Sequence, residues 1–296
     1  MQRKTYAVID GNVIKENIKE IKKHYPDYKY YIGVVKNNAY HHGIKCVTSM
    51  IDGGINYFAV SSLEEAISLR NYTDFPILIL EPIAIDLVLD AINFNLTITI
   101  DSLDYAKKLV GVDLFAKLKV HLAVDSGMNR LGIKDAKELK ETYSLLLAND
   151  KINLEGLYTH FATSGIMDPY YDKQLKTFKS ITSSISLKDI PIVHLGRSLT
   201  LVTREKLDFV NGIRLGIIMY GLSLSSNLGG GLKGKLRKLK RTLIRKKYKC
   251  SACHFTNNLK LKTAFSLYSS VMAIRRVYKG DNVGYNTYKI KNDGYI

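Results

Sequence analysis

Eight short apolar runs alternate with amphipathic stretches, and this alternation limits the fold more than any other feature of the chain. The strand candidates are residues 31–35, 57–60, 77–80, 96–100, 119–124, 154–158, 192–194 and 209–214. Helix candidates such as 62–71 and 102–110 lie between them. Strands separated by helices predict an α/β fold with a parallel sheet, either closed as a (β/α)8 barrel or open and doubly wound.

The pattern changes after Gly221, where further strand-like runs at 267–277 and 281–288 predict a second, mostly β region. A length of 296 residues is enough for one large domain and a smaller one. The hydrophobic share of 46% is normal for a soluble globular protein. No run of about 18 apolar residues is present, and the N-terminus lacks the apolar core of a signal peptide.

The three cysteines are Cys46, Cys250 and Cys253, an odd number that argues against a disulfide framework. A reducing, cytoplasmic setting is therefore expected. The last two belong to a CxxCH pattern at 250–254, which is typical of redox or haem-attachment sites. Without a second pair it cannot complete a four-ligand zinc site, so we interpret it as incidental and predict no metal site.

Positive charge is concentrated in one segment. The net charge is +17, and residues 233–249 hold ten Lys or Arg and no acidic residue. Leucines recur there at spacings of four, three and four, which predicts a basic amphipathic helix able to touch anionic lipid or nucleic acid. The alternative is a solvated insertion, which we favour. The glycines at 229–231 indicate a hinge, because no strand and helix flank them as in a phosphate-binding loop.

A lysine, Lys36, directly follows the first strand candidate. Barrels and open α/β sheets keep their active sites at this end of their strands. A partly desolvated lysine can form a Schiff base with a carbonyl cofactor, although a lone strand-end lysine more often faces solvent. The segment is VVKNNAYHHG at 34–43, and it resembles A-V-V-K-A-N-A-Y-G-H-G, the pyridoxal-phosphate lysine motif of alanine racemases.

Four further segments resemble motifs of the same family, in the same order. They are HLAVDSGMNRLG at 121–132, GLYTHFA at 156–162, IRLGIIMYG at 213–221 and VGYNTY at 283–288. On these five motifs the chain is identified as a member of the alanine racemase family. The resemblance implies a (β/α)8 barrel at 11–222 that binds pyridoxal phosphate. It also implies a partial β domain built from 1–10 and 223–296, with the basic insertion at 229–254, and a homodimer with shared active sites.

The resemblance also implies an activity and its two bases. Lys36 would hold pyridoxal phosphate and act as a base on one face of the substrate. Tyr285, donated from the second subunit, would be the base on the other face, and Arg130 would contact the carboxylate of alanine. The expected reaction is the two-base interconversion of L-alanine and D-alanine, which supplies D-alanine for peptidoglycan.

The remaining cofactor contacts follow from the same motifs. Arg214 would donate to the pyridine nitrogen and leave it unprotonated, because an arginine keeps its own proton. His160 would orient Arg214 and the cofactor ring. The groups expected at the phosphate are Tyr40, Ser198 and the backbone amides of Gly216 and Ile217.

Three departures from the family pattern qualify this interpretation. Ala123 replaces a lysine that becomes carbamylated in many members, and Arg197 replaces the asparagine that precedes Ser198. The sequence given ends at Ile296, where family sequences continue, which predicts a truncated chain. The alternatives are therefore a non-catalytic pyridoxal-phosphate-binding barrel or an inactive racemase remnant. A racemase of another small amino acid, such as serine, is a further alternative.

Overall fold

The computed structural model describes residues 5–163, 169–222, 235–236, 239–240, 242–243, 259–285 and 287–296. The chain divides into two compact units, one made of Met1–Ile9 and Phe265–Ile296 and the other of Asp10–Ala264. The predicted domain boundary at residue 222 stays a prediction, because most of residues 223–258 lie outside the described residues.

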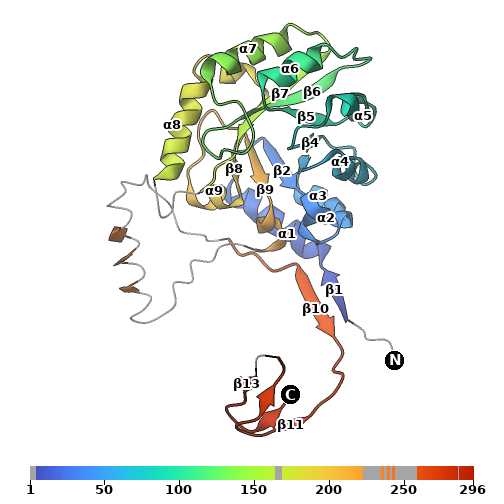
Figure 1. The fold of residues 1–296 in the computed structure, drawn as a ribbon, viewed down its shortest axis with the longest axis vertical. Coiled ribbons are helices and arrows are strands. Elements are labelled where there is room, and N and C mark those ends of the chain that lie inside the picture. Colours follow the sequence, from blue (N-terminus) through green and yellow to red (C-terminus); the bar gives the residue numbers. More distant parts are fainter. Residues whose placement is uncertain are drawn as a thin grey trace. The chain divides into compact units, whose positions relative to one another are not determined.

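The larger unit is a closed barrel of eight parallel strands (Figure 1). Its strands are β2 (Tyr30–Val34), β3 (Tyr57–Val60), β4 (Ile77–Ile79), β5 (Thr97–Ile100), β6 (Leu118–Val124), β7 (Ile152–Thr159), β8 (Ile192–Arg197) and β9 (Gly212–Leu215). β2 pairs with β9 in parallel, and this pairing closes the sheet. The barrel is the closed alternative of the two that the sequence pattern left open.

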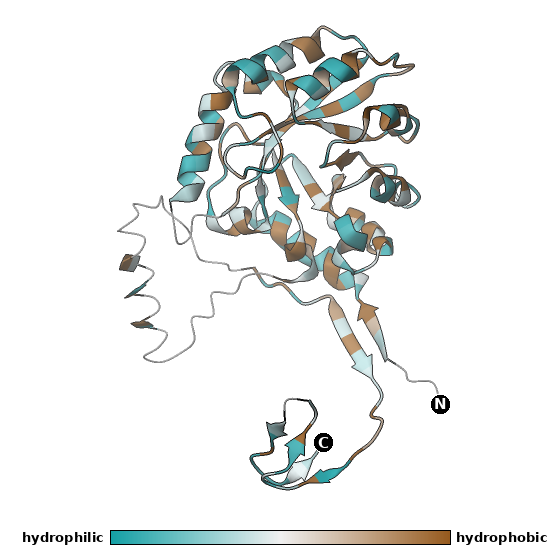
Figure 2. Ribbon diagram, in the orientation of Figure 1, coloured by the Kyte–Doolittle hydropathy of each residue, from teal (hydrophilic) through white to brown (hydrophobic). Residues whose placement is uncertain are grey.

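Helices surround the barrel and bury one side each. They are α1 (Gly11–His24), α2 (Lys36–Tyr40), α3 (Val47–Gly53), α4 (Leu63–Arg70), α5 (Val88–Asn93), α6 (Leu103–Val110), α7 (Ala136–Leu147), α8 (Tyr170–Thr182) and α9 (Ser198–Thr203). Short 3-10 turns are η1 (Ile44–Cys46), η2 (Ile85–Leu87), η3 (Leu187–Asp189) and η4 (Ile217–Tyr220). Hydrophilic and hydrophobic residues alternate along α1 and α7 in Figure 2, as expected of helices with one buried face.

Local sequence signals explain where several helices begin. Ser62 and Ser102 cap α4 and α6, where each hydroxyl accepts a hydrogen bond from a backbone amide three residues further on. Asp135 does the same for α7. Such caps satisfy amide groups that have no partner within the helix and contribute about 1 kcal/mol each.

Apolar side chains fill the inside of the barrel. One buried cluster joins β-strand residues from around the sheet: Ile32, Val34, Tyr57, Ala59, Leu78, Ala123, Tyr158 and Ile192. The barrel is therefore a packed core and not a pore. Ligands are excluded from its centre and have to bind at one end.

The smaller unit contains β1 (Thr5–Ile9) paired antiparallel with β10 (Phe265–Ser269). Its other strands are β11 (Arg276–Val277), β12 (Asn282–Val283), β13 (Tyr288–Lys289) and β14 (Gly294–Tyr295), of which β11 pairs with β14 and β12 with β13. The mostly β character predicted for this region is confirmed. The two long runs predicted at 267–277 and 281–288 are instead divided into short strands and turns.

Two other sequence predictions concern segments that are only partly described. Of the basic run at 233–249, the structure describes residues 235–236, 239–240 and 242–243, which are helical, and Leu236, Leu239 and Leu243 are exposed. The glycines at 229–231 and the CxxCH pattern at 250–254 lie outside the described residues. Within the described part of the chain, no helix has the length and apolar character that crossing a bilayer requires.

Candidate active site

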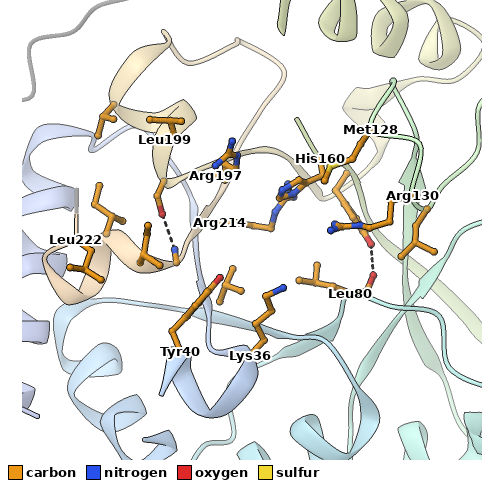
Figure 3. A pocket seen from close by; sticks show the side chains of 18 of the residues that line it. Lys36, Tyr40, Leu80, Met128, Arg130, His160, Arg197, Leu199, Arg214 and Leu222 are labelled. Atoms are coloured by element: carbon orange, nitrogen blue, oxygen red, sulfur yellow. Dashed lines mark hydrogen bonds between the residues drawn. The ribbon is translucent and has the colours of Figure 1, made fainter. Parts of the chain in front are cut away.

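A cavity of about 320 Å³ opens in the larger unit at the end of the barrel where the strands terminate (Figure 3). The side chains that line it come from the ends of β2, β6, β7, β8 and β9 and from the turns that follow them. Eight of the nine residues predicted for the site are among them: Lys36, Tyr40, Arg130, His160, Ser198, Arg214, Gly216 and Ile217. Residues far apart in the sequence therefore meet at one place.

The turn that carries Lys36 has an unusual backbone. Residues 37–41 all have positive φ, between 51° and 64°, so the segment assigned as α2 is a left-handed turn. Each non-glycine residue in this conformation costs roughly 1–2 kcal/mol. The Ala39 amide donates to the Val35 carbonyl at 2.8 Å, and the Ile44 amide donates to the Asn38 side chain at 2.8 Å. The turn directs Lys36 and Tyr40 into the same cavity (Figure 3).

The cavity is rich in positive charge. Four cationic side chains line it, namely Lys36, Arg130, Arg197 and Arg214, against one carboxylate, Asp125. That carboxylate is already held by its own loop, because it accepts from two backbone amides at 2.9 and 3.0 Å and lies 3.6 Å from a lysine ammonium outside the cavity. The cavity therefore suits an anionic ligand.

Arg214 is held in place by hydrogen bonds from the two terminal nitrogens of its guanidinium. Its Nη1 donates to the His194 carbonyl at 2.8 Å and to His194 Nδ1 at 2.6 Å. Its Nη2 donates to the carbonyls of Thr159 and Leu195 at 2.7 and 3.1 Å. Arginine has five N–H donors, so Nε–H is left without a partner among the described residues. Burial lowers the pKa of Arg214 to about 10, and the guanidinium stays protonated at neutral pH.

A chain of hydrogen bonds continues from Arg214 into the barrel. His194 Nε2 lies 2.9 Å from His121 Nδ1, and His121 Nε2 lies 3.4 Å from a carboxylate oxygen of Glu155. Since Arg214 only donates, His194 Nδ1 accepts, and its proton is on Nε2. The same reasoning places the His121 proton on Nε2, where it faces Glu155. The chain thus has one direction, from the guanidinium to the carboxylate.

Burial keeps both of these histidines neutral. It lowers the pKa of His121 and of His194, and in both cases Arg214 lowers it further. For Glu155, burial raises the pKa of the carboxyl, but His121 and Tyr57 outweigh this and hold it below its ordinary value. The hydroxyl of Tyr57 donates to the same carboxylate oxygen at 2.7 Å. Glu155 is therefore charged at neutral pH.

His160 lies beside Arg214 at the cavity wall. Its Nδ1 is 3.4 Å from Nη2 of Arg214, a long contact. Burial lowers the pKa of His160 to about 3, with smaller contributions from Arg214 and Arg130. His160 is thus a neutral imidazole in a group of cations and adds no further positive charge to the cavity.

The groups predicted to bind phosphate gather on one side of the cavity. The Ser198 hydroxyl accepts from the Gly216 amide at 3.0 Å. A Cβ built on Gly216 would lie 3.1 Å from the Tyr40 hydroxyl, so a larger residue at 216 would crowd that hydroxyl. Ile217 follows Gly216 and also lines the cavity. The side chains and the backbone of these four residues thus form one polar cluster, which we call the Ser198 cluster.

Tyr285 is the predicted site residue that the cavity lining does not include. It belongs to the smaller unit, in the turn between β12 and β13, and its side chain is fully exposed, at 101%. Ala123, at the position of the family's modified lysine, is buried in the barrel core and adds no charge beside Arg130. Arg130 makes no ion pair with any described residue.

Several residues at the site were given no role from the sequence. Tyr158 is buried with its ring 5.4 Å from the Arg214 guanidinium, and its hydroxyl donates to the Leu80 carbonyl at 2.9 Å. His121 is the first residue of the 121–132 motif, and His194 lies three residues before Arg197, but the sequence assigned neither of them a function. Their position on strands could have indicated a role at the site. His121 and Ala123 are two residues apart on β6, so their side chains lie on the same face of the strand, the one toward the inside of the barrel.

The fold and the site together define a class of protein: a closed parallel barrel with a cation-rich cavity at the C-terminal ends of its strands, in which a lysine amine has no partner among the described residues. A sequence profile of the alanine racemase N-terminal domain matches residues 9–224. The chain therefore belongs to the alanine racemase family, as the motifs predicted. It is 32% identical over 99% of its length to alanine racemase 1 of Bacillus subtilis (strain 168) and covers 70% of that protein.

Solved structures agree with this assignment. Alanine racemase from E. faecalis superposes with a TM-score of 0.81 at 28% identity, covering 99% of this chain and 73% of that one. A histidine racemase from Leuconostoc mesenteroides subsp. sake superposes with a TM-score of 0.78 at 26% identity, over 99% and 73% of the two chains. The predicted barrel fold is confirmed, and the fold alone is shared by racemases named for different amino acids.

Proposed function

We propose that this protein is a pyridoxal-phosphate-dependent racemase that interconverts L-alanine and D-alanine. One observation carries the proposal: the Lys36 amine and the Arg214 Nε–H are both without a partner among the described residues, and both line a single cavity. The family assignment supports the same activity. In a cell with peptidoglycan, the D-alanine formed would supply the cell wall.

The residues at the cavity fit pyridoxal phosphate. Lys36 offers the amine that would hold its aldehyde carbon, and Arg214 offers one donor for a ring nitrogen that lacks a proton. The Ser198 cluster offers hydroxyl and amide groups for a phosphate. Four cations against one internally bonded carboxylate match the negative charge of a phosphate and a substrate carboxylate.

When bound, pyridoxal phosphate supplies the electron sink that makes the Cα proton of an amino acid removable. Once the amino group of the substrate has replaced it on the cofactor, the Lys36 amine would be free to take or return that proton at Nζ on one face. Arg130 binds the carboxylate and positions the Cα. Arg214 keeps its own proton, because its guanidinium remains charged, and so it donates to the ring nitrogen without protonating it.

The opposite face needs a second acid/base, and we assign it to the Tyr285 hydroxyl of a second copy of the chain. Its full exposure in the smaller unit leaves it available to another subunit. The active form in this proposal is a homodimer in which each copy completes the other's cavity. The two faces then differ in their base, Lys36 on one and Tyr285 on the other.

A second candidate function is pyridoxal phosphate binding without racemisation. The observation that favours it is that the eight predicted residues at the cavity all belong to the larger unit, whereas Tyr285 belongs to the smaller unit. In that case Lys36 and Arg214 serve the cofactor alone. The two candidates differ in whether Tyr285 matters.

The test uses the purified full chain with added pyridoxal phosphate. Racemisation predicts D-alanine formation from L-alanine and a visible absorbance that borohydride removes. Lys36→Ala should abolish both, whereas Lys45→Ala, an exposed lysine outside the cavity, should change neither. Tyr285→Phe should keep the absorbance and slow racemisation by about a hundredfold or more.

Two results would decide against racemisation of alanine. If the protein binds the cofactor but forms no D-alanine, its function is pyridoxal phosphate binding without racemisation. Faster turnover of serine or histidine than of alanine would change the substrate and keep the reaction. Analytical ultracentrifugation of the same sample tests the homodimer, because a fully active monomer is incompatible with a base from a second copy.

A further inference from the structure

Arg197 is a cation of the cavity wall whose charge has no partner in the described part of the chain. It ends β8, where its Cα lies opposite that of Arg214 on β9. Its side chain is partly buried and lines the cavity (Figure 3). The Nε atom is buried without a hydrogen-bond partner, and no described carboxylate forms an ion pair with the guanidinium.

An arrangement of this kind costs stability. An arginine remains protonated, so partial burial withdraws a full charge from water, and nothing in the described protein replaces the lost hydration. Arg197 also lies close enough to Arg214 and His160 to lower the pKa of both. A fold that holds unpaired charge at a cavity wall gains from it when a ligand brings the counter-charge.

The position of Arg197 indicates which ligand group it meets. It is the chain neighbour of Ser198, whose hydroxyl accepts from the Gly216 amide. Arg197 also opposes the effect of burial on the pKa of the Tyr40 hydroxyl, which places its charge near that group too. Arg130, which also lines the cavity and forms no ion pair with a described residue, comes from the loop after β6. The two arginines therefore serve different anionic groups.

We propose that Arg197 binds the phosphate monoester of the cofactor directly, as a charged donor within the Ser198 cluster. The motif that this segment resembles has an asparagine here, a neutral amide, whereas this chain has a charged side chain. A monoester carries about −1.5 to −2 charge at neutral pH, and a guanidinium matches its oxygens with two parallel N–H donors. The proposal rests on the proposed function, because it takes pyridoxal phosphate as the ligand.

The test measures binding to the apo-protein of three compounds: pyridoxal phosphate, pyridoxal without the phosphate, and inorganic phosphate. Arg197→Asn should weaken the binding of pyridoxal phosphate and of inorganic phosphate by about 10- to 100-fold, which is the effect of losing one charged hydrogen bond. It should leave the affinity for pyridoxal unchanged. Arg197→Lys should recover part of the loss, and Arg276→Asn, which removes an exposed arginine of the smaller unit, should have no effect.

The stability of the apo-protein provides a second readout. Because Arg197 has no ion-pair partner in the described part of the chain, Arg197→Asn should not lower the melting temperature without ligand, but it should reduce the increase that pyridoxal phosphate causes. If Arg197 had only a structural role, its substitution would lower the melting temperature of the protein without ligand. Unchanged affinity for pyridoxal phosphate, or equal weakening of pyridoxal phosphate and pyridoxal, would overturn the proposal.

The same titrations separate this proposal from the proposed function. If the wild-type chain binds pyridoxal phosphate but forms no D-alanine, the racemase assignment fails and the Arg197 comparison still stands. If it binds inorganic phosphate through Arg197 but not pyridoxal phosphate, the phosphate site exists and the cofactor is wrong. Binding of neither compound by the wild type overturns both.

Discussion

Acidification should destabilise the barrel, because three of its histidines are held neutral. The pKa of His160 is lowered to about 3, and those of His121 and His194 are also lowered, with burial the largest cause in each case. In the unfolded chain the same imidazoles regain a pKa near about 6.5. Between these values the unfolded state binds more protons than the folded state, so stability falls as the pH drops below about 6.5.

The size of the effect follows from the shifts. Well below pH 6.5, a histidine whose folded pKa is far lower removes about 1.4 kcal/mol of unfolding free energy for every pH unit. For His160, with a folded pKa of about 3, the loss integrated from about pH 7.5 to about pH 5 is roughly 2 kcal/mol. His194 and His121 add to this loss in the same direction. A typical domain has only about 5–15 kcal/mol in total. Glu155 has a lowered pKa, so its contribution to stability is lost only below this pH range.

The assay is urea unfolding at about pH 7.5, 6 and 5, followed by circular dichroism. His160→Gln should reduce the acid-induced loss by roughly 2 kcal/mol, because the titrating group whose folded pKa is about 3 is gone. Lys45→Ala, which removes an exposed side chain outside the cavity and no histidine, is the control and should leave the loss unchanged. A flat unfolding free energy between these pH values, or an equal loss in His160→Gln and wild type, would refute the reasoning.

Two substitutions test packing and hydrogen bonding away from the cavity. Gly156→Ala should cost about 1–3 kcal/mol, because its Cβ would lie 2.5–2.6 Å from the His121 ring. Gly294→Ala has open space around it and serves as control, and equal urea midpoints for the two variants would contradict the prediction. Asn17→Ala should cost about 2–3 kcal/mol, since the buried Asn17 amide bonds both backbone groups of Lys262. Thermal unfolding measures it, and a neutral variant would show that these bonds contribute nothing.

Most of the barrel was predictable because each strand is a short apolar run with turn signals on both sides. The run at 57–60 coincides with β3 (Tyr57–Val60), and the run at 209–214 was placed too early, since β9 is Gly212–Leu215. The early residues there form a turn in which Asn211 bonds the backbone of Val193 in both directions. Closure depends on the pairing of β2 with β9, a long-range contact that local periodicity does not encode.

The left-handed turn after Lys36 was not predictable from propensity. Asn37 and Asn38 tolerate positive φ better than most residues, but Ala39 and Tyr40 do not favour it. Tertiary contacts impose the conformation, with Ala39 completely buried and the Asn37 amide bonded to the Glu65 side chain. The motif identified the lysine, whereas the surrounding structure decides the path of the backbone.

The cavity residues were predictable for a different reason, since the ends of parallel strands converge in any barrel. Lys36, Arg214 and His160 each follow or end a strand. The hydrogen-bond chain through His121 and Glu155 was not predicted, because strand alternation gives the face of a side chain but not its partner across the barrel. The site role of Tyr285 depends on a second copy of the chain, and no pattern within one sequence tests it.

The hydrogen-bond chain links acid stability to the proposed cofactor site. His194 accepts a hydrogen bond from Arg214 only while its Nδ1 carries no proton. Protonation of His194 would place two donors against each other and a second positive charge beside the guanidinium. Arg214 would then lose one of the two acceptors of Nη1 and keep the His194 carbonyl, so the contacts that orient Nε–H toward a ligand would weaken. Burial of His194 therefore does two things at once: it makes the barrel sensitive to acid, and it helps to hold the Arg214 donor that we assign to the cofactor in one position at neutral pH.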